Sequence, residues 1–80
     1  GEAQMRFYFD VKNGKFSRDD TGTELADRNA ARGEALAVLA PIAKDAFPEN
    51  GVNSVSVTVR DSERKPIFHA SLALVEDWIE

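Results

Sequence analysis

Three carboxylates crowd the segment RDDTGTEL, residues 18–25, and are the first candidates for chemistry in this chain. Asp19, Asp20 and Glu24 offer the oxygen atoms that Ca²⁺ or Mg²⁺ prefers. An EF-hand loop, however, needs acids at alternate positions and a glutamate that closes a loop of about twelve residues. The spacing fits a turn instead, because aspartate side chains accept hydrogen bonds from nearby amides and Gly22 tolerates a positive φ. We therefore predict a turn here and no metal site.

His69 is the single histidine, and acid–base or nucleophilic catalysis requires a second group that orients the imidazole. Serines such as Ser17, Ser54, Ser56 and Ser71 are available, but no nucleophile-elbow motif surrounds any of them. One histidine without cysteine does not make a zinc site of nitrogen and sulfur ligands. No phosphate-binding glycine motif occurs either. We predict no catalytic residue and no cofactor, with His69 on a solvated strand face beside Tyr8 and Thr58.

The composition excludes several kinds of partner. The net charge of −4 repels a phosphate backbone, and Arg64 with Lys65 is the densest basic cluster, so no nucleic-acid binding is expected. No apolar run approaches the roughly 18–20 residues of a membrane span. The chain of 80 residues has no cysteine, which makes a disulfide-rich secreted scaffold improbable and the cytoplasm the expected compartment.

The elements that would position these residues follow from hydrophobic periodicity. MRFYFDV alternates, with Phe7 and Phe9 towards the core and Tyr8 and Asp10 towards water. Asn13-Gly14 then predicts a two-residue hairpin loop. This loop would pair Val11 with Phe16, place Phe16 in the core and start a second strand over residues 15–19.

The segment from Arg28 to about Phe47 has helical spacing, and Asp27 is the expected N-cap. Its apolar stripe comprises Ala31, Ala35, Val38, Leu39, Ile42 and Ala46. Pro41 predicts a kink within this helix. Two more alternating segments follow, with Val55, Val57 and Val59 in the first and Phe68, Ala70, Leu72 and Leu74 in the second. Arg60 is expected to face water.

These elements predict an α+β fold of the ββαββ type, with a four-stranded antiparallel sheet and one long helix packed on one face. The chain geometry favours the strand order 2-1-3-4 and leaves 2-1-4-3 open. Residues 5–74 would form a single domain. Residues 1–4 are expected to be flexible or vector-derived, and residues 75–80 to be a tail or a short helix.

Three motifs together are familiar: the aromatic first strand RFYFDV, the turn DDTGTEL and the helix start DRNAARGEAL. Over residues 5–74 the chain resembles an uncharacterised family of short alphaproteobacterial proteins, domain of unknown function 6894. The resemblance implies the same fold and brings no catalytic residues, although Pro41 departs from the unbroken helix expected. The order of elements is also similar to the small domain of HicB-type antitoxins, as fold analogy alone.

These observations favour a non-enzymatic interaction or regulatory module, with self-association into a homodimer or a protein partner as its mode of action. Two alternatives stay open: an antitoxin-like partner of a toxin, and an enzyme subunit whose site is completed across an interface. The candidate interaction surface consists of Val75, Trp78, Ile79 and Ile67. The competing possibility is that the tail folds back on its own core.

Overall fold

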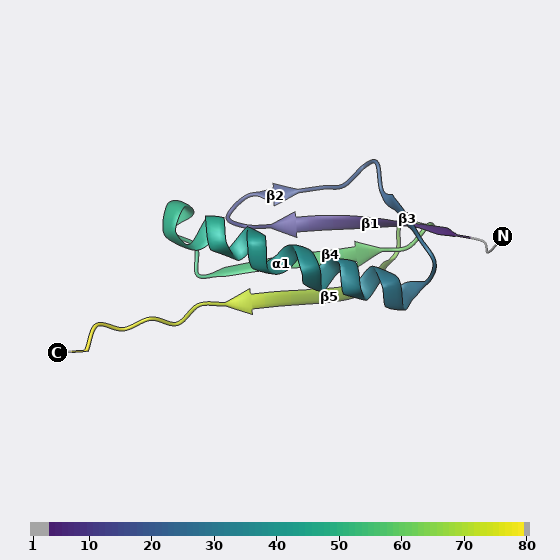
Figure 1. The fold of residues 1–80 in the computed structure, drawn as a ribbon. Coiled ribbons are helices and arrows are strands. Elements are labelled where there is room, and N and C mark those ends of the chain that lie inside the picture. Colours follow the sequence, from purple (N-terminus) through teal and green to yellow (C-terminus); the bar gives the residue numbers. More distant parts are fainter. Residues whose placement is uncertain (1–3, 80) are drawn as a thin grey trace.

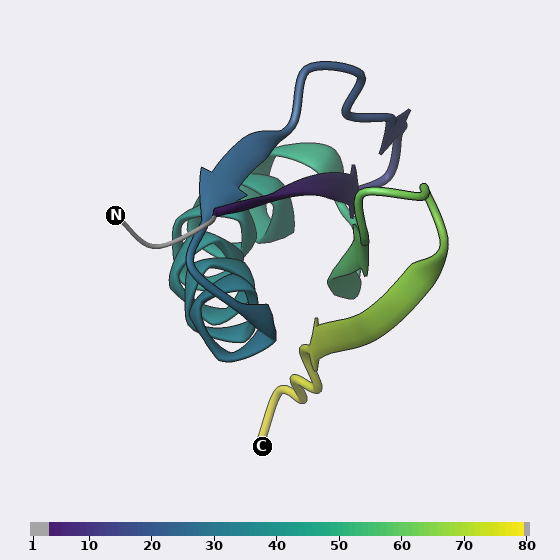
Figure 2. The same ribbon diagram turned by 90° about the vertical axis from the view of Figure 1, so that its right-hand side faces the viewer.

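Six elements follow one another along residues 4–79, the part of the chain that this computed structural model describes (Figure 1). They are β1 (Met5–Lys12), β2 (Phe16–Ser17), β3 (Thr23–Leu25), α1 (Arg28–Asn50), β4 (Ser54–Arg60) and β5 (Pro66–Ala73). The antiparallel sheet has the order β2-β1-β4-β5, and β3 also pairs with β1. The helix α1 lies against one face of this sheet (Figure 2).

The strand expected over residues 15–19 is shortened to β2, and β3 is a further strand that was not predicted, so the sheet has five strands rather than four and the succession is βββαββ. β2 pairs with the end of β1, and β3 pairs with its beginning. Between these pairings, residues 18–22 lie opposite residues 8–10 and form a loop. The predicted order 2-1-3-4 agrees with the observed order of β2, β1, β4 and β5, and 2-1-4-3 is wrong.

Phe16 lies on the face of the sheet opposite the helix, which corrects the predicted hairpin register. Lys12 pairs with Phe16 and Val11 with Ser17, so the loop contains three residues instead of two. Gly14 adopts a φ of +102° in this loop. A shift of one residue moves a side chain to the other face of a sheet. Phe16 is consequently 65% exposed instead of being part of the core.

The helix begins as predicted and ends three residues later than expected. The carboxylate of Asp27 accepts a hydrogen bond from the amide of Ala30 at 2.8 Å, which confirms the N-cap. Gly51 ends the helix with a φ of +66°. Pro41 and Pro48 lie within α1 without interrupting it. Both prolines are exposed, so water can solvate the carbonyl groups that lose their amide partner.

The core lies between α1, β1 and β4. Its buried members are Phe7, Ala31, Ala35, Leu39, Ala43, Ala46, Val55, Val57 and Val59. Four residues of the predicted helical stripe are buried, whereas Val38 and Ile42 are half-buried at its border. The alanines let the helix approach the sheet closely, where β4 fills the interface with valines.

The opposite face of the sheet is not uniformly open to water, contrary to the prediction. Tyr8, Asp10 and Arg60 were expected to be solvated, yet they retain only 7%, 8% and 5% exposure. Residues 18–22 cover them, because a turn that folds over the sheet supplies the polar groups with partners. Period-two alternation predicts which face a side chain occupies, but not whether a loop covers that face.

The C-terminal residues 74–79 form no regular structure, so the expected short helix is wrong. They extend beyond the sheet in the direction of β5 (Figure 1). The expectation for residues 1–4 lies outside the described residues except for Gln4, which is exposed. Within residues 4–79, no helix is long and apolar enough to cross a membrane.

Candidate functional site

A buried ionic cluster joins β1, β4 and the loop of residues 18–22. Arg60 donates from Nε to Asp10 Oδ2 at 2.8 Å and from Nη2 to Asp10 Oδ1 at 3.0 Å. The same Nη2 donates to the carbonyl oxygen of Asp19 at 2.7 Å. The guanidinium also lies over the ring of Tyr8, 5.0 Å from its centroid, and Arg64 lies 5.1 Å from the same ring. This cluster fixes the loop to the sheet.

Asp19 forms hydrogen bonds both within the acidic turn and to β1. Its Oδ1 accepts hydrogen bonds from the amides of Thr21 and Gly22, both at 3.0 Å. Its Oδ2 accepts from the amide of Phe9 at 3.0 Å, and its own amide donates to Asp10 Oδ1 at 2.9 Å. Residues 18–22, between β2 and β3, do not pair with β1 as a strand. The hydrogen bonds of the Asp19 carboxylate hold this segment against β1 instead.

The pKa values of both aspartates reflect these partners. Burial alone would raise the pKa of Asp10, but hydrogen bonds from Arg60 and the Asp19 amide and the charge of Arg60 together lower it. Burial would likewise raise the pKa of Asp19, but hydrogen bonds from three backbone amides lower it. Hydrogen bonding to Asp10 raises the pKa of Arg60 despite its burial. All three groups are held in their charged forms, which suits a structural role.

The other two acids of the turn point to separate partners. Glu24 pairs with Arg6 at 2.9 Å, and Asp20 lies 3.5 Å from Arg18. In the part of the chain that the structure describes, no group of three histidine or acidic residues is arranged to hold a metal ion. The turn interpretation thus accounts for the position of each carboxylate.

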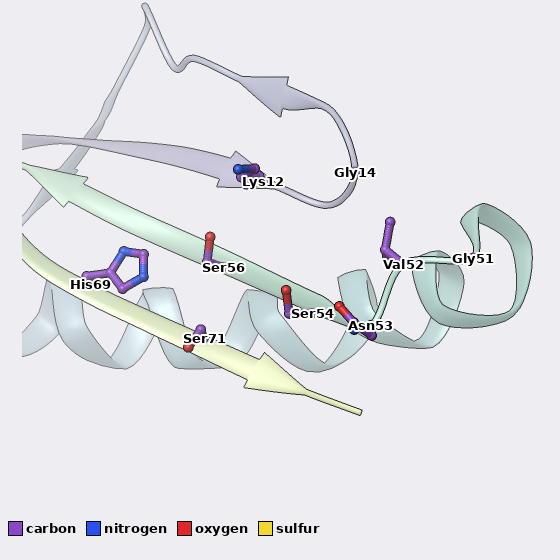
Figure 3. A pocket seen from close by; sticks show the side chains of 9 residues that line it. All are labelled: Lys12, Gly14, Gly51, Val52, Asn53, Ser54, Ser56, His69 and Ser71. Carbon is purple, nitrogen blue, oxygen red and sulfur yellow. The ribbon is translucent and has the colours of Figure 1, made fainter. Parts of the chain in front are cut away.

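His69 lies on the open part of the sheet face, where its Nδ1 is 2.9 Å from Thr58 Oγ1. It lines a shallow hollow with Lys12, Ser56, Ser71 and neighbouring residues (Figure 3). No carboxylate of residues 4–79 hydrogen-bonds to this imidazole. Tyr8, expected beside His69 and Thr58, is instead buried beneath Arg60 and Arg64. The three residues therefore do not form one exposed aromatic surface.

The outer edge of β5 is the most prominent unpaired feature of the described sheet. The amide of Leu74 donates to the carbonyl oxygen of Asn53 at 2.8 Å, on the side of β4. Because antiparallel pairing alternates, even-numbered residues of β5 bond to β4 and the odd-numbered residues His69, Ser71 and Ala73 direct their amides and carbonyls outwards. The sequence of this strand, PIFHASLA, contains no lysine, arginine or acid.

The other edge of the sheet is protected against pairing. β2 and β3 contain only two and three residues, and the loop of residues 18–22 separates them. Lys15 and Arg18 place charges along this edge. Short strands, interruptions and charged side chains are the means by which proteins prevent edge-to-edge association. β5 has only two such features. Its first residue is Pro66, and its pairing with β4 is irregular between Val59 and Arg60.

The predicted interaction residues fall into two groups. Val75, Trp78 and Ile79 lie together on the extended tail and are 86%, 97% and 94% exposed. Ile67 lies at the other end of β5, is half-buried and packs against the core. The structure therefore brings the three tail residues together and separates Ile67 from them.

Sequence reasoning missed the exposed leucines between the helix and β5. Leu36 and Leu72 are each 41% exposed. Leu36 lies one helical turn from both Arg32 and Ala40. Arg32 lines a hollow together with residues of β5, and Ala40 lines another together with the start of the tail. The sequence did contain a sign of this exposed apolar surface, because Leu36 is a leucine one position outside the predicted stripe.

These features define a small α+β domain whose helix covers one face of the sheet and whose last strand has an open edge. The chain belongs to the family described as Domain of unknown function (DUF6894), whose model matches residues 6–73. This match confirms the resemblance drawn from the strand, turn and helix-start motifs. Comparisons with curated proteins and with solved structures returned no match.

Proposed function

We propose that this chain is a non-enzymatic interaction module that forms a homodimer by antiparallel pairing of two β5 edges. The observation that carries the proposal is the contrast between the two edges of the sheet. β5 is eight residues long without lysine, arginine or acid, and its residues His69, Ser71 and Ala73 direct their amides and carbonyls outwards, whereas the opposite edge is short, interrupted and charged. Pairing would satisfy these backbone groups without bringing like charges together.

Apolar surface beside the edge supports the same mode of association. A second β5 would lie about 5 Å away in the plane of the sheet. Leu72 lies in β5 on the helix side, and Leu36 lies one helical turn from Arg32, which lines a hollow with β5, so an added strand would remove part of both side chains from water. We also propose a cytoplasmic location, consistent with a chain that lacks cysteine.

Sedimentation equilibrium of the wild type, Ser71→Pro and Ser71→Ala tests this proposal. Ser71 is exposed and its amide points away from β4, so proline removes an outward donor without removing a bond within the sheet. We expect the wild type and Ser71→Ala to be dimers in the micromolar range and Ser71→Pro to be a folded monomer. A folded Ser71→Pro protein that dimerises as tightly as Ser71→Ala would exclude the β5 edge.

A further inference from the structure

We infer that the acidic, tryptophan-bearing tail of one copy docks on a second copy, in a hollow between the beginning of α1 and the beginning of β5. This inference rests on the proposed pairing of β5 edges. The hollow has a volume of about 170 Å³ and is lined by Arg28, Ala31, Arg32, Ile67 and Phe68, among others. The apolar floor and the two arginines at its rim fit an indole ring flanked by carboxylates.

The charges of the tail and the hollow are complementary. The sequence Val75–Ile79 carries two acids, Glu76 and Asp77, beside Trp78 and no basic residue. Arg28 and Arg32 are exposed, and neither forms an ion pair with another residue of the described range 4–79. Complementary charges select and orient a partner even where they add little affinity.

The helix side of β5 is the face on which Trp78 has to lie. Phe68, Ala70 and Leu72 face the helix, because they pair with the buried valines of β4. Leu74 and Glu76 line a second hollow with α1 residues and so lie on the helix side of the sheet. A second copy paired with β5 would extend the alternation into the tail and place Trp78 on the same side.

A two-fold axis through Leu72 brings the tail to the hollow. Residues directly opposite each other in an antiparallel pair share a face, and the outward-directed odd residues must bond to one another. With Leu72 opposite its own copy, Ser71 bonds to Ala73, and Glu76 lies opposite Phe68 of the second copy on the helix face. Trp78 follows Glu76 by two residues and would reach the hollow that Ile67 and Phe68 line.

The tail of the same chain does not reach this hollow. Trp78 follows Ala73 by five residues, which span at most about 17 Å. The hollow lies at the start of β5, and an eight-residue strand is about 26 Å long. The tail also leaves the sheet in the opposite direction (Figure 1). A second copy is therefore the occupant that the geometry admits.

Fluorescence of Trp78, the single tryptophan of the chain, tests the docking directly. Acrylamide quenching and the emission maximum are measured across the concentration range over which sedimentation detects the dimer. We expect dimerisation to shift the emission to shorter wavelength and to reduce quenching severalfold. Arg28→Glu with Arg32→Glu should restore full quenching and weaken dimerisation roughly tenfold. Adding Glu76→Lys and Asp77→Lys to that variant should recover both the protection from quenching and the dimerisation.

Arg18→Glu is the matched control, because Arg18 is an exposed arginine on the opposite edge of the sheet. It should leave quenching and dimerisation unchanged. A dimer in which Trp78 is quenched as readily as in the monomer overturns the docking and leaves β5 pairing intact. Quenching protection that is independent of concentration, in a monomer, shows that the tail folds on its own chain and also overturns it. A wild type that never dimerises overturns both proposals.

Discussion

Arg60 is the residue on which the far face of the sheet depends. Its guanidinium connects the end of β4 to Asp10 in β1 and to the carbonyl of Asp19, and it lies over Tyr8. Nη1 is the one buried side-chain nitrogen or oxygen in the described chain that lacks a hydrogen-bond partner. An ion pair this deeply buried is costly to leave half-formed, because a lone charge then remains in a poorly solvated site.

Asp10→Asn should therefore lower the free energy of unfolding by about 3–5 kcal/mol, since it leaves the Arg60 charge uncompensated. Asp10→Leu combined with Arg60→Met should recover much of this loss, because neither charge then remains buried. Urea unfolding followed by circular dichroism measures both variants. Equal stability of Asp10→Asn and the wild type would show that the ion pair is not formed in solution.

The same carboxylates should make the protein sensitive to acid. The folded-state pKa values of Asp10 and Asp19 are lowered, so the unfolded chain binds more protons as the pH falls. Their contribution to stability is complete above the ordinary aspartate pKa of about 4 and is lost as the pH falls towards the folded-state values. Melting temperatures from pH 7 to pH 2 should fall less steeply for Asp19→Asn than for the wild type. A parallel fall of the two curves would contradict the assigned shifts.

At the scale of elements, Gly22 shapes the loop that covers the far face. Its φ is +78°, and a Cβ atom there would lie 2.8 Å from Arg6 Cγ and 3.0 Å from the Phe7 carbonyl oxygen. Gly22→Ala should lower the free energy of unfolding by more than about 1 kcal/mol, because alanine is strained in this conformation and its Cβ has no space. Gly33→Ala is the control: it lies in α1 with nothing within 4 Å and should stabilise by about 0.5–1 kcal/mol. Chemical unfolding showing the same sign for both substitutions would refute this account of the loop.

The apolar stripe of α1 forms the helix side of the core, and Leu39 within this stripe is only 4% exposed. Leu39→Asp should abolish folding, because it adds a buried unpaired carboxylate to the loss of a leucine worth about 2–5 kcal/mol. Ala37→Asp, at an exposed position of the same helix, should melt close to the wild type. A cooperative thermal transition of Leu39→Asp near the wild-type temperature would refute the assignment.

The elements differ in how well the sequence predicts them. The helix is predicted well because its signals are local: an aspartate that caps it and apolar residues at helical spacing. Asp10 and Arg60 pair across 50 positions, and an alternating pattern carries no information about such a partner. The hairpin register failed for a related reason. Asn13-Gly14 favours a two-residue loop locally, whereas the hydrogen bonds of Asp19 to β1 fix the return strand one residue out of that register.

For the whole molecule, the candidate site follows from topology more than from motifs. The tail residues Val75, Trp78 and Ile79 were visible in the sequence as an apolar cluster. The unpaired edge of β5 and the hollow near Arg32 appear only once the strand order and the helix position are known. The central claim is that two such edges associate.

Light scattering coupled to size exclusion, on the wild type and on a chain that ends at Leu74, tests this claim most directly. The account predicts that the wild type has twice the 8.8 kDa mass of one chain at micromolar concentration. It predicts that the shortened chain, which keeps β5 but loses Trp78, shifts towards the monomer at the same concentration. A wild type that stays at 8.8 kDa at high micromolar concentration would contradict the account.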